Sequence, residues 1–196
     1  MVHRIFFERD GCAVKLFANG ALLLGCAFIM TACAPAPQST AVPEPAVARP
    51  EWFAMELTDA QTGEVFTMND YAGKVVLVET MAIWCPNCAV QGNEVRNLHR
   101  LLGDEDELIS ITLDVDFNED AAALKEYASF YGFDWHFAVA PLLLARALGN
   151  LYTAQYLNPP LSPMLIIDRQ GSVHHLQYGL KKAETLREIV APYLAD

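Results

Sequence analysis

The chain has 196 residues, 53% of them apolar, and a formal net charge of −11 at pH 7. This length suits one domain with short appendages. The acidic balance opposes binding to phosphate backbones and to anionic membrane surfaces, and no basic stripe is visible, so we expect no nucleic-acid partner.

The amino-terminal segment predicts a secretion signal rather than a part of the fold. Leu16–Met30 is an unbroken, largely apolar run, shorter than the about 20 residues of a spanning helix and within the range of a signal-peptide core. It ends in Met30-Thr31-Ala32-Cys33, which resembles the lipobox of bacterial lipoproteins. That resemblance implies a signal peptide over residues 1–32 and a lipidated Cys33. An uncleaved amino-terminal anchor is the alternative, and both tether the protein outside the cytoplasm to a bacterial cell membrane.

A Pro/Ala-rich segment, Ala34–Pro50, comes next. Such chains stay extended at about 3.1 Å per residue and cannot pack a core, so we expect residues 33–50 to hold the domain away from the membrane. A globular pattern begins at residue 51, which predicts one domain over 51–196.

Apolar periodicity predicts alternating strands and helices in this domain. An amino-terminal hairpin precedes them, and a second hairpin and a helix follow them. This order indicates an α/β sandwich with a central mixed sheet flanked by helices. The expected strands cover residues 52–57, 64–68, 75–81, 108–113, 134–140, 163–168 and 172–178. The expected helices cover residues 86–102, 119–131, 141–148 and 181–194.

The stretch Trp84-Cys85-Pro86-Asn87-Cys88 lies where a buried strand gives way to a helix. Two cysteines separated by two residues at such a junction are typical of a dithiol redox site. Cys85 would lie at the mouth of the helix, where unpaired N–H groups and the helix dipole favour an anionic sulfur. Cys88 lies one turn further along the same helix face, within reach of Cys85.

The same two cysteines could instead form half of a metal site. Zinc usually takes four nitrogen or sulfur ligands, and the chain has no second CxxC. His136, His174 and His175 suggest copper, but adjacent histidines in a strand point to opposite faces. We therefore expect a dithiol that needs no metal and no organic cofactor. A redox-inert interaction domain is a further alternative.

These features resemble the thioredoxin fold and, within it, the TlpA/ResA-type thiol–disulfide oxidoreductases. The resemblance rests on the strand that ends in Trp-Cys-x-x-Cys, on Glu79 six residues before the first cysteine, and on Ser162-Pro163 opening a late strand. The amino-terminal hairpin, the long central insertion and the tether are similar as well. Members of that group reduce disulfides outside the cytoplasm, often during cytochrome c maturation.

The resemblance implies a role for each of these residues. Cys85 would be the nucleophile and Cys88 the resolving thiol, the two forming a disulfide when oxidised, and Glu79 would relay a proton to or from Cys88. A membrane electron donor would reduce that disulfide again. The Ser162–Pro163 bond would be cis. Cysteine-containing protein substrates would contact a surface lined by Trp84, Pro86, Asn87, Ser162 and Pro163.

The sequence also departs from that family pattern. Pro86-Asn87 separates the cysteines, whereas the group commonly has proline just before the second cysteine, so a dithiol oxidase stays an alternative to a reductase. Sco-type copper chaperones share the fold but use CxxxC, which makes a copper-binding module a weaker alternative. Peroxiredoxins carry threonine three residues before the reactive cysteine, and here that residue is Ala82.

Overall fold

The structure, a computed structural model, describes residues 49–195 except 104–105. These residues belong to one compact unit. The expected signal peptide, Cys33 and almost all of the expected tether lie outside the described residues. Within the described ranges, no helix combines the length and the apolar character that crossing a membrane requires.

A five-stranded mixed sheet in the order β5-β4-β3-β6-β7 forms the centre of the domain. β3 (Val75–Met81) is its middle strand, and all seven of its residues are buried. It runs parallel to β4 (Leu108–Asp114) and antiparallel to β6 (Met164–Ile167). β5 (His136–Val139) pairs with β4 in parallel, and β7 (Val173–His175) pairs with β6 in antiparallel. The expected mixed α/β sheet is confirmed.

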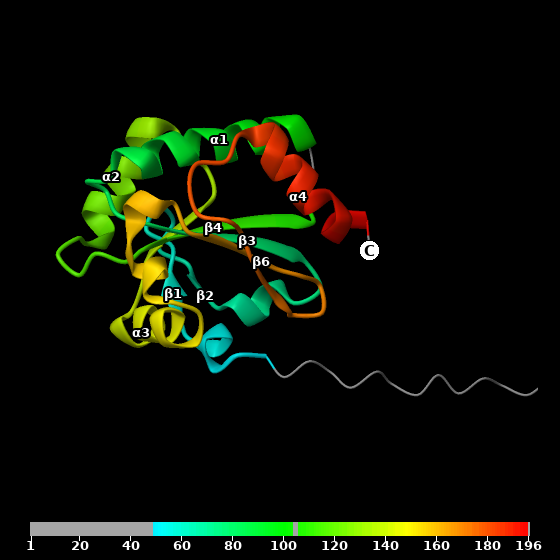
Figure 1. The fold of residues 1–196 in the computed structure, drawn as a ribbon. Coiled ribbons are helices and arrows are strands. Elements are labelled where there is room, and N and C mark those ends of the chain that lie inside the picture. The colour runs from blue at the N-terminus through cyan, green and yellow to red at the C-terminus, as the bar shows by residue number, and fades with distance from the viewer. Residues whose placement is uncertain (1–48, 104–105, 196) are drawn as a thin grey trace, which may run out of the picture. The chain divides into compact units, whose positions relative to one another are not determined.

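Helices cover both faces of this sheet (Figure 1). Three helices lie on one face, and the fourth lies on the other together with the amino-terminal hairpin. In chain order the helices are α1 (Pro86–Leu102), α2 (Ala121–Tyr131), α3 (Leu142–Leu151) and α4 (Ala183–Ala195). α3 is the helix that shares its face of the sheet with the hairpin.

Side-chain alternation along β3 divides the apolar core into two clusters. Val75, Leu77 and Met81 pack into the cluster under α1, α2 and α4. Val76 and Val78 pack into the cluster on the α3 side. The same alternation places the odd-numbered Glu79 on the face that α1 covers.

The expected strand over 52–57 is wrong for its first half. Residues Glu51–Ala54 form a short 3-10 helix, η1, and only β1 (Leu57–Thr58) pairs with β2 (Val65–Phe66). Trp52 and Phe53 are 0% and 1% exposed. Two adjacent side chains can both reach the core from a helical turn, whereas a strand would point them to opposite faces.

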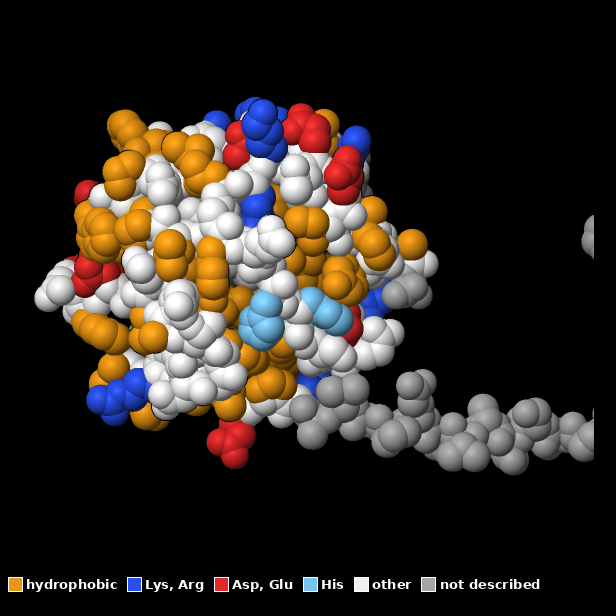
Figure 2. All heavy atoms as spheres, in the orientation of Figure 1, with side chains coloured by type: hydrophobic (Ala, Val, Ile, Leu, Met, Phe, Trp, Pro, Cys, Tyr) orange, Lys and Arg blue, Asp and Glu red, His pale blue; other side chains and the backbone are white. Residues whose placement is uncertain are grey.

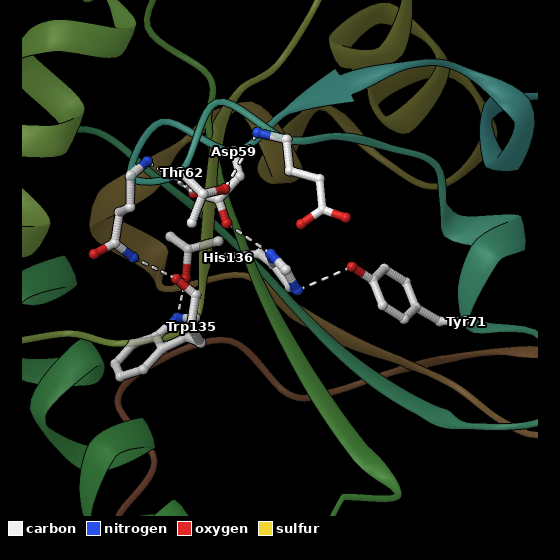
Figure 3. Close-up of polar contacts among 8 residues, drawn as sticks. Asp59, Thr62, Tyr71, Trp135 and His136 are labelled. Carbon is white, nitrogen blue, oxygen red and sulfur yellow. Dashed lines mark hydrogen bonds and ion pairs between the residues drawn. The ribbon is translucent and has the colours of Figure 1, made fainter.

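A chain of polar contacts fastens this hairpin to the main sheet (Figure 3). Asp59, which follows β1, contacts His136 Nδ1 on β5 at 2.7 Å. The other ring nitrogen of His136 lies 2.9 Å from the Tyr71 hydroxyl. Tyr71 ends η2 (Met68–Tyr71), so the three side chains join the hairpin, η2 and β5.

Other elements differ from expectation mainly at their ends. α2 begins at Ala121 because the Asp120 side chain accepts the Ala123 N–H at 2.9 Å and so caps the helix. The central insertion contains two further 3-10 turns, η3 (Ala154–Leu157) and η4 (Pro159–Leu161). η4 brings the chain to the start of α1, where the dithiol lies.

Candidate redox site

Cys85 occupies the position that caps the amino terminus of α1. Its Sγ accepts the backbone N–H of Cys88 at 3.3 Å. Pro86 takes the first helical position, where a missing N–H is tolerated. The Cys88 N–H and the positive end of the helix therefore point at Cys85 Sγ, and this placement suits the sulfur atom that attacks in disulfide exchange.

Both cysteines are free thiols in this structure, and both are buried. Cys85 is 1% exposed and Cys88 is 2% exposed. Residues of η4 lie against the motif: Cys88 Sγ is 3.6 Å from the carbonyl oxygen of Pro159, and Asn87 Nδ2 donates to the carbonyl oxygen of Pro160 at 2.8 Å. Both thiols are therefore buried, and η4 lies against Cys88 and Asn87.

Glu79 lies beneath the motif and is only 3% exposed. Its side chain and that of Cys88 line one internal space that is too small to hold a water molecule. Burial raises the pKa of Glu79 to about 8, and the positive charge of Lys181 partly opposes this rise. A carboxyl group with such a pKa can take up or release a proton near neutral pH.

Cys88 needs a nearby proton acceptor in order to become a thiolate. Burial is the main reason that the pKa of the Cys88 thiol is raised, and the hydrogen bond with Cys85 and the charge of Glu79 add to the rise. Cys88 therefore stays protonated until a base removes its proton. Glu79 is the carboxyl group that shares its cavity.

Lys181 is a site residue that sequence reasoning missed. It is 7% exposed, and its Nζ donates to the carbonyl oxygens of Gly179 at 2.6 Å and Ser162 at 3.3 Å. The Gln91 side chain on α1 holds the backbone N–H and carbonyl of Lys181 at 2.8 and 3.0 Å. Its burial lowers the pKa of Lys181, and Glu79 counteracts this. In the sequence, Lys181 stands beside Lys182 just before a helix, and lysines at such positions are usually exposed to solvent. The sequence alone therefore does not mark Lys181 as buried.

Acidic residues after β4 hold the loop that leads into the motif, and sequence reasoning missed these too. Asp116 Oδ2 accepts the indole N–H of Trp84 at 2.6 Å, and Glu119 Oε2 accepts the N–H of Ile83 at 2.7 Å. Asp114 is fully buried beside them. Burial raises the pKa of Asp114 to about 7, and the nearby Glu119 adds to the rise.

The predicted cis bond before Pro163 is wrong: among the peptide bonds of the described residues, none is cis. Ser162 instead adopts a left-handed conformation, with φ 46° and ψ 59°, and this turns the chain from η4 into β6. Both residues are buried, and the carbonyl oxygen of Pro163 accepts the Thr80 N–H at 3.1 Å. The structure thus places Ser162 and Pro163 beneath the surface, whereas Trp84 is 57% exposed.

The histidines that suggested copper lie in other networks. His174 contacts Asp168 at 2.7 Å, and His175 contacts the Tyr156 hydroxyl at 2.8 Å. Over the part of the chain that the structure describes, no three His, Cys, Asp or Glu side chains are grouped so that they could hold a metal ion. On the face shown in Figure 2, Lys and Arg side chains are scattered and form no basic stripe.

A mixed sheet whose middle strand leads into a CxxC motif at the start of a helix defines a thioredoxin-like oxidoreductase. The Redoxin family model matches residues 34–191, and the chain belongs to that family. No curated protein sequence matches the chain.

Solved structures show the same fold. A thiol:disulfide interchange protein of the thioredoxin family from Chlorobium tepidum is 19% identical, with a TM-score of 0.58 over 71% of this chain and 92% of that one. A secreted Mycobacterium tuberculosis disulfide oxidoreductase, homologous to E. coli DsbE, is 16% identical, with a TM-score of 0.55 over 72% and 98%. BsSco, of the Sco family of cytochrome c oxidase assembly proteins, is 16% identical, with a TM-score of 0.57 over 71% and 91%.

Proposed function

We propose that this protein is a membrane-tethered thiol–disulfide oxidoreductase that reduces protein disulfides outside the cytoplasm. One observation carries the proposal: Cys85 caps α1 beneath η4, and Cys88 behind it shares a closed space with a carboxyl group whose pKa is about 8. This arrangement supplies an attacking thiolate, a resolving thiol and a base for that thiol.

The reaction consists of two exchanges at sulfur. The Cys85 thiolate attacks one sulfur of a substrate disulfide, the substrate S–S bond breaks, and the other substrate sulfur leaves as a thiolate that takes a proton. Glu79 then accepts the proton of Cys88, whose thiolate attacks Cys85 Sγ and releases the second substrate sulfur. The substrate gains two thiols, and the protein is left with a Cys85–Cys88 disulfide. A membrane electron donor returns two electrons, and two protons restore the dithiol.

The place and direction of the reaction rest on sequence features. The lipobox ending at Cys33 and the Pro/Ala-rich tether support attachment to a bacterial cell membrane, with an uncleaved anchor as the alternative. The resemblance to TlpA/ResA-type proteins supports the reducing direction and a place in cytochrome c maturation. Pro86 directly after Cys85 favours a dithiol oxidase as the second candidate.

The reduction potential of the dithiol tests the direction. We would equilibrate the domain, produced from residue 34 onward, with glutathione or dithiothreitol buffers and measure the oxidised fraction. A potential near −270 mV, as in thioredoxin, supports the reductase, whereas about −120 mV indicates an oxidant. Loss of exchange with small disulfides in Cys85→Ser checks the nucleophile. Copper that copurifies with the protein and is lost in the same variant would favour the Sco-like alternative.

A further inference from the structure

A tyrosine side chain borders the closed space that Glu79 and Cys88 share. Tyr127 belongs to α2, and its side chain lines this space together with the carboxyl group of Glu79 and the thiol of Cys88. Tyr127 is 7% exposed, and within residues 49–195 without 104–105 its hydroxyl group has no hydrogen-bond partner. The reaction described above uses the carboxyl group and the thiol but leaves this hydroxyl without a role.

Packing accounts for the ring of Tyr127 but not for its hydroxyl group. The ring centroid lies 4.9 Å from that of Tyr131, 6.1 Å from that of Phe133 and 6.4 Å from that of Phe137. Phenylalanine could make the same ring contacts. A buried hydroxyl without a partner costs free energy, because it gives up its hydrogen bonds to water and gains none in the protein. The hydroxyl therefore calls for a partner that forms in another state of the site.

The carboxyl group of Glu79 has the matching deficit. Its Oε1 atom is buried and has no hydrogen-bond partner in the part of the chain that the structure describes. A buried carboxylate needs donors, and the space is too small to hold a water molecule that could supply one. Thr112 also lines the space, but its Oγ1 already accepts the Trp135 indole N–H at 2.9 Å. Cys88 already contacts η4. Tyr127 is thus the donor in this space that is still available.

The Tyr127 hydroxyl keeps its proton. Burial is the main reason that the pKa of Tyr127 is raised, and the charges of Cys88 and Glu79 add to the rise. Tyr131 and Cys85 contribute in the same direction. The hydroxyl therefore acts as a hydrogen-bond donor and not as a base.

Titratable groups from three elements act on Glu79. The two cysteines belong to the start of α1, Tyr127 belongs to α2, and Lys181 lies just before α4. Lys181 Nζ donates to two backbone carbonyl oxygens, and its charge favours the carboxylate form of Glu79. A hydrogen bond from Tyr127 would favour the same form.

We propose that Tyr127 is a positioning residue for the second exchange: its hydroxyl donates a hydrogen bond to the Glu79 carboxylate and so keeps that group ready to accept the proton of Cys88. This inference rests on the proposed function, because it concerns the base of that same site. The Cys88 proton passes to Glu79, the Cys88 sulfur forms a bond with Cys85 Sγ, and the substrate sulfur leaves as a thiolate. Tyr127 neither gains nor loses a proton.

Tyr127→Phe tests the proposal, because it removes the hydroxyl and keeps the aromatic ring. Without a hydrogen bond to its charged form, Glu79 should titrate about one pH unit higher. Infrared spectra of the reduced full chain at a series of pH values follow the band of the protonated carboxyl group, which Glu79→Gln identifies by its loss. Resolution of the mixed disulfide by Cys88 should shift to higher pH by the same amount and be about tenfold slower below the inflection. Its formation by Cys85 should stay at the wild-type rate.

Tyr131→Phe is the matched control. Tyr131 lies on the same helix and stacks on Phe133, but it does not line the space. The infrared titration and the pH profile of this variant should equal those of the wild type. A purely structural role of Tyr127 predicts a different result: its replacement by phenylalanine would remove an unpartnered buried hydroxyl, raise the free energy of unfolding and leave the titration of Glu79 in place. That result would overturn the inference.

The inference and the proposed function fail in different ways. If the Glu79 titration is the same in Tyr127→Phe and the wild type while resolution still follows that titration, the inference is wrong and the proposed function stands. If the wild-type protein does not react even with a small aromatic disulfide, the proposed function is wrong. The infrared titration would still report the hydrogen bond in that case, because it requires no turnover.

Discussion

Asn87 donates a hydrogen bond from Nδ2 to the carbonyl oxygen of Pro160 at 2.8 Å. The contact joins the middle of the CxxC motif to η4, the segment that lies against the resolving cysteine. Cys85, in the same motif, is only 1% exposed. We therefore expect the access of a reagent to the buried dithiol to depend on the position of η4.

Asn87→Ala should speed the reaction of Cys85 with iodoacetamide. One net hydrogen bond contributes about 0.5–1.5 kcal/mol, so its loss should increase the open population about two- to tenfold. The initial rate, with the modified cysteine identified by peptide mass spectrometry, measures this effect. Asn97→Ala, on the same helix and away from η4, is the control. Equal rates for Asn87→Ala and the wild type would show that η4 is not held by this contact.

Glu79→Gln should slow the second exchange without loss of the fold. In the wild type, the pKa of Glu79 is about 8, so resolution by Cys88 should accelerate as pH rises toward that value and Glu79 loses its proton. Glutamine cannot accept the proton, and the inflection should disappear. Stopped-flow measurement of the decay of the mixed disulfide tests this expectation. An unchanged rate and pH profile would remove Glu79 from the mechanism.

Lys181→Met should move that inflection to higher pH. The Lys181 charge lowers the pKa of Glu79 against the effect of burial, so its removal should raise the Glu79 pKa further. Lys181→Arg keeps the charge and should keep the inflection near its wild-type position. Lys182→Met, at the exposed neighbouring residue, should leave the profile unchanged. If the pH dependence of resolution by Cys88 is the same in Lys181→Met and the wild type, the charge of Lys181 does not influence the pKa of Glu79.

The contribution of Glu79 and Asp114 to the free energy of unfolding should fall as pH rises from about 4 to 8. Burial raises the pKa of Glu79 to about 8 and that of Asp114 to about 7, above their values in the unfolded chain. These two groups therefore bind more protons in the folded state than in the unfolded state in this window, and their contribution to stability decreases as those protons are lost.

Asp114→Asn should make the free energy of unfolding depend less on pH. Between pH 5 and pH 8 we expect the variant to lose about 1–2 kcal/mol less than the wild type. Urea unfolding at the two pH values measures the change. Asp106→Asn, at an exposed position, should keep the wild-type slope. A steeper loss of stability with rising pH in Asp114→Asn than in the wild type would contradict a raised pKa of Asp114 in the folded state.

The sheet and its main helices could be predicted because apolar periodicity reports burial directly. β3 opens with four Val and Leu residues and is buried on both faces, and α1 begins directly after the cysteine that caps it. Periodicity failed at Trp52 and Phe53, where a 3-10 turn buries neighbouring side chains that a strand would separate. It also cannot show that a Cβ on Gly92 would lie 2.6 Å from the Phe133 ring, since that contact joins α1 to the segment that follows α2.

The sequence by itself determined the thioredoxin-like α/β class and the dithiol, because both depend on residues close together in the chain: Cys85 and Cys88 are one helical turn apart, and Glu79 lies on the strand that precedes them. Only the tertiary structure decided how this site is covered and approached. The contact of Asn87 with Pro160 spans 73 residues, and that of Trp84 with Asp116 spans 32. Such pairs depend on where irregular segments pack across the ends of the strands, and local propensity carries no information about that packing.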